Sequence, residues 1–65
     1  MILEEFFNNM WCNGEYRVIM NTYSFDIYKK KGHGYAFIAT MPIVEFSSGN
    51  DLWEHVQNFI PDDEK

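Results

Sequence analysis

An alternating run of residues from Tyr16 to Ile27 is the feature that most constrains the fold of this chain. Apolar and aromatic side chains occupy every second position in the run, a period that is typical of a β-strand with one buried face. The apolar phase slips by one residue at Asn21 and Thr22, which indicates a bulge or a turn. The sequence therefore predicts extended structure over about residues 16–28, as one bent strand or as two short ones.

A second extended segment follows the sequence KKKGHG at residues 29–34. We interpret KKKGHG as a turn with a basic tip, because its two glycines can adopt positive φ angles. The chain beyond it is almost continuously apolar, which predicts a central strand over about residues 35–41. Pro42 cannot donate a hydrogen bond to a sheet and marks the end of that strand. A short last strand is expected over about residues 43–46.

The N-terminal segment has apolar residues at helical spacing. Many of them recur four positions apart, and glutamates and asparagines take the opposite face. The apolar set is Ile2, Leu3, Phe6, Phe7, Met10 and Trp11. This pattern predicts a helix over about residues 2–11 that ends at Asn13 and Gly14, which both tolerate the left-handed conformation.

The C-terminal segment carries the signals of a second helix. Ser48 and Asp51 fit a helix-capping pattern, and Asn50 is an alternative cap. An apolar stripe follows until a proline. These signals predict a helix over about residues 51–60. Residues 61–65 form a short acidic tail. Together the elements predict a single domain of class α+β, in which an antiparallel sheet of three or four strands is flanked by an N-terminal and a C-terminal helix.

Aromatic residues are unusually frequent for so short a chain. Six Phe, four Tyr and two Trp occur among 65 residues. A chain of this length buries only about 60% of the surface that its unfolded form exposes. Part of the aromatic surface is therefore expected to face a partner, which is either a second copy or another protein.

The charge balance limits the kinds of partner. The chain has ten acidic and five basic residues, so its formal net charge is −5. Nucleic-acid binders usually carry a basic face, so nucleic acid is an unlikely partner apart from the basic residues Lys29, Lys30 and Lys31. The acidity suits a partner protein with a basic surface, although it also serves solubility alone.

The same sequence gives expectations about location. No apolar run approaches the roughly 20 residues that span a bilayer, and the N-terminus is acidic where a signal peptide is apolar. Cys12 is the sole cysteine, so an internal disulfide is impossible. We therefore expect a cytoplasmic protein, in the host cytoplasm if a phage encodes it.

No catalytic or metal-binding constellation is visible. Cys12 with His33 or His55 provides the residue types of a nucleophile and a base, but nothing in the sequence orients them. Asp51 and His55 are four residues apart on the second helix, yet a structural zinc site needs four ligands. The sequence thus predicts no enzymatic activity, no cofactor and no metal.

The expected binding residues lie on the two helices. Aromatic and methionine side chains are enriched at interface cores, which favours the first helix as the apolar anchor. The apolar anchors are Phe6, Phe7 and Trp11, and the charged contacts are Glu4, Glu5, Asp51 and Glu54. A sheet edge is the rival site, because unpaired strand groups recruit another strand.

Two weak motifs link the chain to known kinds of protein. The order Gly34-Tyr35, Pro42 and Gly49-Asn50-Asp51-Leu52 within residues 23–60 resembles HicB-type antitoxins. The sequence FSSGNDLWEHVQNFIP at residues 46–61 is similar to the strand-to-helix passage of some small phage anti-CRISPR proteins. Both resemblances imply a small acidic protein that occludes a larger one. The first hypothesis is therefore a protein-binding inhibitor that acts sterically, and the alternative is a structural homodimer.

Overall fold

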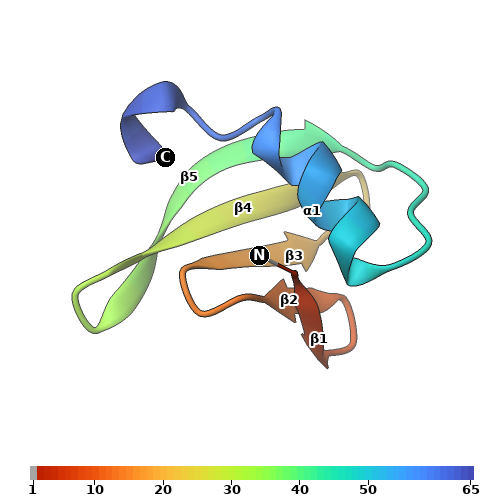
Figure 1. Cartoon of the computed structure of the whole chain (residues 1–65), viewed down its shortest axis with the longest axis horizontal. Coiled ribbons are helices and arrows are strands. Elements are labelled where there is room, and N and C mark those ends of the chain that lie inside the picture. Colours follow the sequence, from red (N-terminus) through yellow and green to blue (C-terminus); the bar gives the residue numbers. More distant parts are fainter. Residues whose placement is uncertain (1) are drawn as a thin grey trace.

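The computed structural model describes residues 2–65 and shows one antiparallel sheet with a helix on one of its faces (Figure 1). The strands lie side by side in the same order as in the sequence, so a hairpin joins each strand to the next. The elements are β1 (Glu4–Phe7), β2 (Met10–Cys12), β3 (Tyr16–Met20), β4 (Ser24–Lys31), β5 (Gly34–Pro42), α1 (Gly49–Gln57) and the short 3-10 helix η1 (Asp62–Glu64).

The N-terminal segment is a hairpin, so the predicted helix over residues 2–11 is wrong. β1 and β2 pair across a turn at Asn8 and Asn9, with Phe7 opposite Met10. Asn9 has a φ of 65°, a left-handed conformation that asparagine tolerates better than most residues. Two short strands around a two-residue turn produce nearly the same spacing of apolar residues as a helix. The fold is therefore a five-stranded sheet with one α-helix, and the expected N-terminal helix is replaced by two strands.

The predicted strand over residues 16–28 is divided into β3 and β4. The Asn21 N–H donates to the carbonyl of Ser24 at 2.7 Å and closes the turn between them, where the apolar phase slips. β4 then continues through all three lysines, so the basic segment is strand and the turn is confined to Gly32 and His33. Gly32 has a φ of 61°, which glycine adopts without strain.

No strand forms over residues 43–46, where one was predicted. β5 ends at Pro42, which lacks the N–H group that would continue a ladder. Val44 and Phe46 nevertheless pack against the core. The residues that alternate with them, Ile43 and Glu45, are exposed. The alternation in the sequence is therefore real, but it belongs to an irregular segment that covers the core on its way to α1.

A β-bulge in β5 sets which side chains face away from the helix. The register shifts by one residue between Ile27 and Tyr28 of β4, so one residue of β5 has no direct partner. Ile38 and Ala39 both pack towards the core as a result. Phe37 and Thr40 on either side of them face the opposite way, beside their partners on β4.

The core lies between one sheet face and α1. The helix begins after Ser48, whose hydroxyl accepts a hydrogen bond from the Asp51 N–H at 3.2 Å. A second helix is therefore present with Ser48 and not Asn50 as its cap, but it ends at Gln57, earlier than the predicted residue 60. The buried apolar residues of the sheet and the helix form one cluster: Leu3, Trp11, Tyr16, Val18, Phe25, Ile27, Met41, Leu52, Trp53, Val56 and Ile60. Most of the cluster residues that lie on strands alternate with residues whose side chains point to the sheet face away from α1.

The first turn of α1 touches the beginning of the chain. A Cβ atom built on Gly49 would lie 1.6 Å from the backbone oxygen of Leu3. Glycine is thus required where α1 meets the segment that leads into β1. None of the helices in residues 2–65 is long and apolar enough to span a membrane.

Candidate functional site

The sheet face opposite α1 carries an uncovered cluster of aromatic side chains and one arginine. Arg17 on β3, Tyr28 on β4 and Phe37 on β5 are direct neighbours across the strands. Tyr35 lies two residues before Phe37 on the same face. We call these four residues the open-face cluster. Both α1 and η1 lie on the other side of the sheet, so no described element packs over the cluster (Figure 1).

The members of the open-face cluster contact one another. The Arg17 guanidinium carbon lies 4.1 Å from the centroid of the Tyr35 ring, a cation–π contact. The rings of Tyr28 and Phe37 are edge-to-face at 5.8 Å. Phe37 is still 58% exposed. The cluster is therefore ordered by its own contacts, and it leaves the exposed Phe37 ring open to a partner, with the half-buried Tyr28 and Tyr35 beside it.

Arg17 has spare capacity to bind an acceptor. Within residues 2–65 it forms no ion pair, and its Nε atom is buried without a hydrogen-bond acceptor. A buried donor left unpaired is costly, and the guanidinium must shift out of its buried position before a partner's carboxylate or carbonyl can accept from Nε. The face thus combines apolar area with one unsatisfied cationic donor.

The open face has a polar end near the β3–β4 turn. The Asp26 carboxylate accepts hydrogen bonds from the side chains of Asn21, Ser24 and Thr40. These donors tie β4 to the β3–β4 turn and to β5. Asp26 is thus occupied with holding the sheet together and bounds the apolar part of the face.

The predicted apolar anchors separate into two groups. Phe6 and Phe7 on β1 are each 63% exposed and contact each other at 4.8 Å between ring centroids, so they are available to a partner. Trp11 is only 8% exposed and packs edge-to-face on Phe25 and Phe46. Trp11 is therefore a core residue and not a surface anchor, because β2 turns it towards α1 while its neighbours face outwards.

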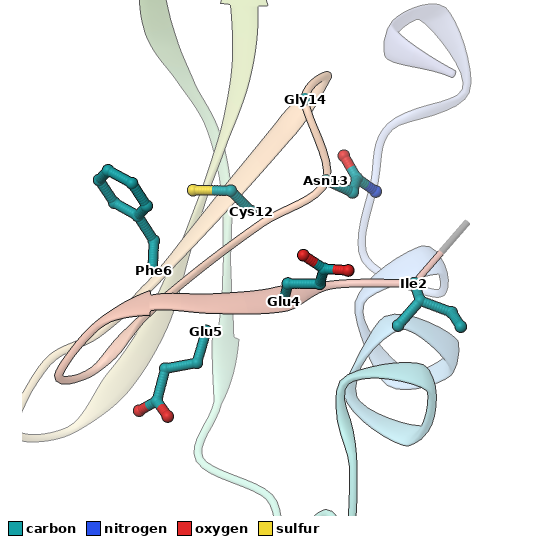
Figure 2. A pocket seen from close by; sticks show the side chains of 7 residues that line it. All are labelled: Ile2, Glu4, Glu5, Phe6, Cys12, Asn13 and Gly14. Carbon is teal, nitrogen blue, oxygen red and sulfur yellow. The ribbon is translucent and has the colours of Figure 1, made fainter.

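A shallow hollow adjoins β1. The hollow has a volume of about 370 Å³. Its lining residues are Ile2, Glu4, Glu5, Phe6, Cys12, Asn13 and Gly14 (Figure 2). Phe6 and Cys12 lie on one side of the hairpin and Glu5 on the other. Cys12 is opposite Arg17 across the strands, so Phe6 borders the open face. The hollow extends that face and holds no set of residues suited to catalysis.

The predicted charged residues are divided between two elements. Glu4 and Glu5 are exposed on β1, and Glu54 is exposed on α1. Asp51 has a structural role, because its carboxylate accepts a hydrogen bond from the Ser47 N–H at 2.9 Å and lies 3.7 Å from His55. The seven predicted residues therefore do not form a single surface.

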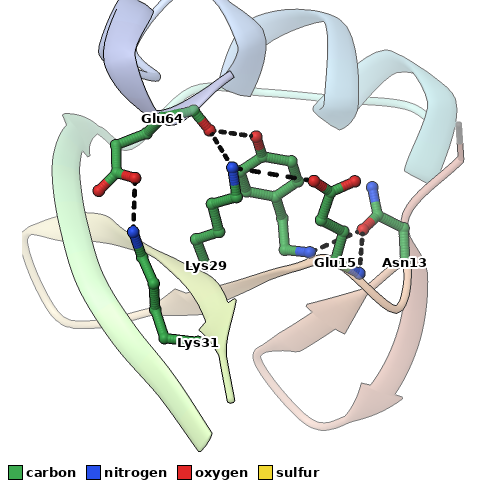
Figure 3. A network of polar contacts seen from close by, with 6 residues as sticks. Asn13, Glu15, Lys29, Lys31 and Glu64 are labelled. Atoms are coloured by element: carbon green, nitrogen blue, oxygen red, sulfur yellow. Dashed lines mark hydrogen bonds and ion pairs between the residues drawn. The ribbon is translucent and has the colours of Figure 1, made fainter.

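The three lysines do not form the predicted basic turn. Lys29 donates to the backbone oxygen of Glu64 at 2.7 Å, and Lys31 pairs with the Glu64 carboxylate at 2.7 Å (Figure 3). The buried Tyr16 hydroxyl donates to the same backbone oxygen at 2.6 Å. Two of the lysines thus fix η1 on the sheet, and Lys30 is left exposed on the strand.

Removal of residues 62–65 is expected to destabilise the domain by about 1–3 kcal/mol, because the hydrogen bonds from the Tyr16 hydroxyl and from Lys29 to the Glu64 backbone oxygen are both lost. Urea unfolding of the shortened chain measures the loss. Glu64→Ala is the matched control, since it keeps the backbone acceptor and removes only a partly exposed ion pair with Lys31, at a cost below about 1 kcal/mol. Equal losses in the two variants would contradict this role of the Glu64 carbonyl.

The candidate nucleophile and the two candidate bases lie on different elements of the fold. Cys12 lies on β2, His33 in the β4–β5 turn and His55 on α1. Among residues 2–65 no group of three or more histidine, cysteine or acidic side chains is arranged to hold a metal ion. The strongest candidate site is therefore a binding surface.

The sequence contains a signal for that surface. Residues such as Arg17 and Tyr28 alternate with the buried members of the same strands, so they must face away from the core. The helix predicted over residues 2–11 instead favours a partner surface in the N-terminal segment. Comparison of the chain with protein-family models, curated proteins and solved structures found no match.

Proposed function

We propose that this chain is a protein-binding module that docks the open face of its sheet on a larger protein and blocks a surface of it. The uncovered open-face cluster is the observation that carries this proposal, because small sheets normally bury such aromatic area. Aromatic residues and arginine are also the residue types that contribute most to binding energy at protein interfaces. The resemblance to antitoxin and anti-CRISPR proteins leads to the same kind of function, inhibition of a host protein by occlusion.

The charge distribution supports a partner with a basic region. Glu54 and Asp62 are exposed on the side of the molecule that carries α1 and η1. Long-range attraction between the net negative charge of the whole chain and a basic region of the partner would speed the encounter, while the aromatic face would hold the complex. This division of roles agrees with the net charge of −5.

The target is found by purifying the tagged chain from lysate of the organism that encodes it, after nuclease treatment. Tyr28→Ala should then weaken binding of that target by at least about tenfold, because truncation of a central aromatic residue removes a large share of interface energy. Isothermal titration with the purified target measures the change. Circular dichroism verifies that the variant is folded.

Tyr23→Ala is the matched control. Tyr23 is 89% exposed and lies in the β3–β4 turn, outside the open-face cluster. This variant should bind as the unaltered chain does. Unchanged binding by Tyr28→Ala, together with a loss in Glu54→Ala, would instead assign the contact to the helix side and overturn the proposed surface.

A further inference from the structure

β5 is an outer strand of the sheet, so the prediction of a central strand over residues 35–41 is wrong in this respect. β5 also lacks the usual protection of an edge. Within the described chain it pairs with β4 alone. Its nine residues, Gly34–Pro42, contain no charged side chain. Edge strands of monomeric proteins are commonly protected by charged residues that prevent pairing with another chain. The free edge of β5 is therefore open to a further strand.

The opposite edge of the sheet differs in this respect. β1 has four residues, of which Glu4 and Glu5 are acidic. Two β1 strands paired together would gather the carboxylates of both copies on one ladder, and like charges that face each other are destabilising. Two copies of β5 can meet without any such repulsion, although the chain as a whole is acidic.

We propose that β5 pairs antiparallel with β5 of a second copy, so that two five-stranded sheets become continuous about a two-fold axis. The occupant is a second copy because the uncharged edge of β5 lets two copies of an acidic chain approach each other without opposing charges at the contact. This inference goes beyond the proposed function and does not depend on it.

Two constraints set the register of the pair. The bulge interrupts the middle of β5, and Pro42 at its end has no backbone N–H group. Gly34–Phe37 is therefore the regular part of the strand in which every residue has a backbone N–H. Residues directly opposite in an antiparallel pair point to the same face, so the two-fold axis must pass beside a residue. With Ala36 at the axis, Tyr35 of each copy lies opposite Phe37 of the other.

This register covers the most exposed member of the open-face cluster. Phe37 gains an aromatic neighbour, and aromatic cross-strand pairs are among the favourable ones in sheets. A register centred on Tyr35 would leave Phe37 beyond the paired run and uncovered. The two open faces would also lie side by side and form one larger surface.

The register places Phe37 of the second copy beside two cations. The Arg17 guanidinium lies over the Tyr35 ring, and Lys30 is the partner of Tyr35 on β4. A positive side chain at position 37 would be repelled there and a negative one attracted. The sign of the charge at this position therefore tests the proposed geometry.

Sedimentation equilibrium of the purified chain, from low micromolar to near-millimolar concentration, is the first measurement. We expect a weak, reversible dimer, because an interface of one strand pair is small. At low salt the dimer of Phe37→Lys should have a dissociation constant at least about tenfold higher than the dimer of Phe37→Glu. Added salt should reduce this difference between the two dissociation constants. An overall charge effect would give the reverse order, since the net charge becomes −4 (−5 + 1) with lysine and −6 (−5 − 1) with glutamate.

Tyr23→Lys is the matched control, because it makes the same charge change at an exposed aromatic residue outside β5. It should leave the dimer intact. Amide exchange followed at several concentrations supplies an independent reading, with protection in β5 that rises with concentration. A chain that stays monomeric throughout, a dimer that protects β1 instead, or equal dissociation of the lysine and glutamate variants would each overturn the proposal.

Discussion

Gly49→Ala is expected to destabilise the domain by at least about 3 kcal/mol, because the added methyl group would overlap a backbone carbonyl. The new Cβ atom would lie 1.6 Å from the Leu3 oxygen and 2.8 Å from the Leu3 carbonyl carbon. Backbone atoms cannot turn aside as the end of a flexible side chain can. The first turn of α1 must therefore separate from the start of the chain.

The sign of this effect is opposite to that of helix propensity. Alanine in an exposed helix interior is favoured over glycine by about 1 kcal/mol. The close contact with Leu3 reverses that preference. Urea unfolding measures the loss, which is large against a total of roughly 3–10 kcal/mol for a chain of this length.

Gly34→Ala is the matched control for this substitution. A Cβ atom on Gly34 meets nothing within 4 Å, and its φ lies outside the range that favours glycine. The control should change stability by less than about 1 kcal/mol. A Gly49→Ala variant as stable as the control would show that α1 does not contact Leu3 as described.

Trp11→Ala should cost about 3–5 kcal/mol, the usual range for removal of a buried aromatic side chain. The indole is 8% exposed, and it packs on Phe25 of the sheet and on Phe46 of the segment before α1. Its loss leaves a cavity where β2, β4 and that segment meet. The near-ultraviolet circular dichroism and the urea midpoint should both fall.

Phe7→Ala is the control on the neighbouring strand. Phe7 is 63% exposed, and its truncation should change stability by less than about 1 kcal/mol. If Trp11→Ala were as stable as Phe7→Ala, the indole would belong to the surface and would again be a candidate for partner binding.

The parts of the fold that depend on local signals could be predicted from the sequence. The second helix has its cap at Ser48 and an apolar stripe within one short segment, although it ends at Gln57 and not at Pro61 as the sequence suggested. The turn between β3 and β4 appears as a change of apolar phase at Asn21. Neither feature needs a contact with a distant part of the chain.

The N-terminal hairpin could not be predicted because its pattern fits two structures. Leu3 and Trp11 are the buried members of an apolar set that also suits a helix. The pairing of Trp11 with Val18 of β3 decides the matter, and this contact joins separate segments. The Asn8-Asn9 pair was the local sign of a turn, since asparagine accepts a positive φ.

The open-face cluster was not among the site residues predicted from the sequence. Phe6 and Phe7 are exposed as expected, but the sequence does not reveal that one sheet face has no helix over it. Lys29 and Lys31 resemble a free basic patch until their contacts with Glu64 are known. Such pairings between distant residues follow from the fold and leave no mark in the local sequence.

Because each strand of the sheet pairs with the strand that follows it in the sequence, folding can proceed in the order of synthesis. Neighbouring strands close short loops, and chains rich in such nearby pairings fold fast. The contacts that join distant segments, Gly49 with Leu3 and Tyr16 with Glu64, depend on residues made after the sheet. On a ribosome the emerging sheet would therefore wait with its apolar face exposed until the segment that contains α1 and η1 has left the exit tunnel.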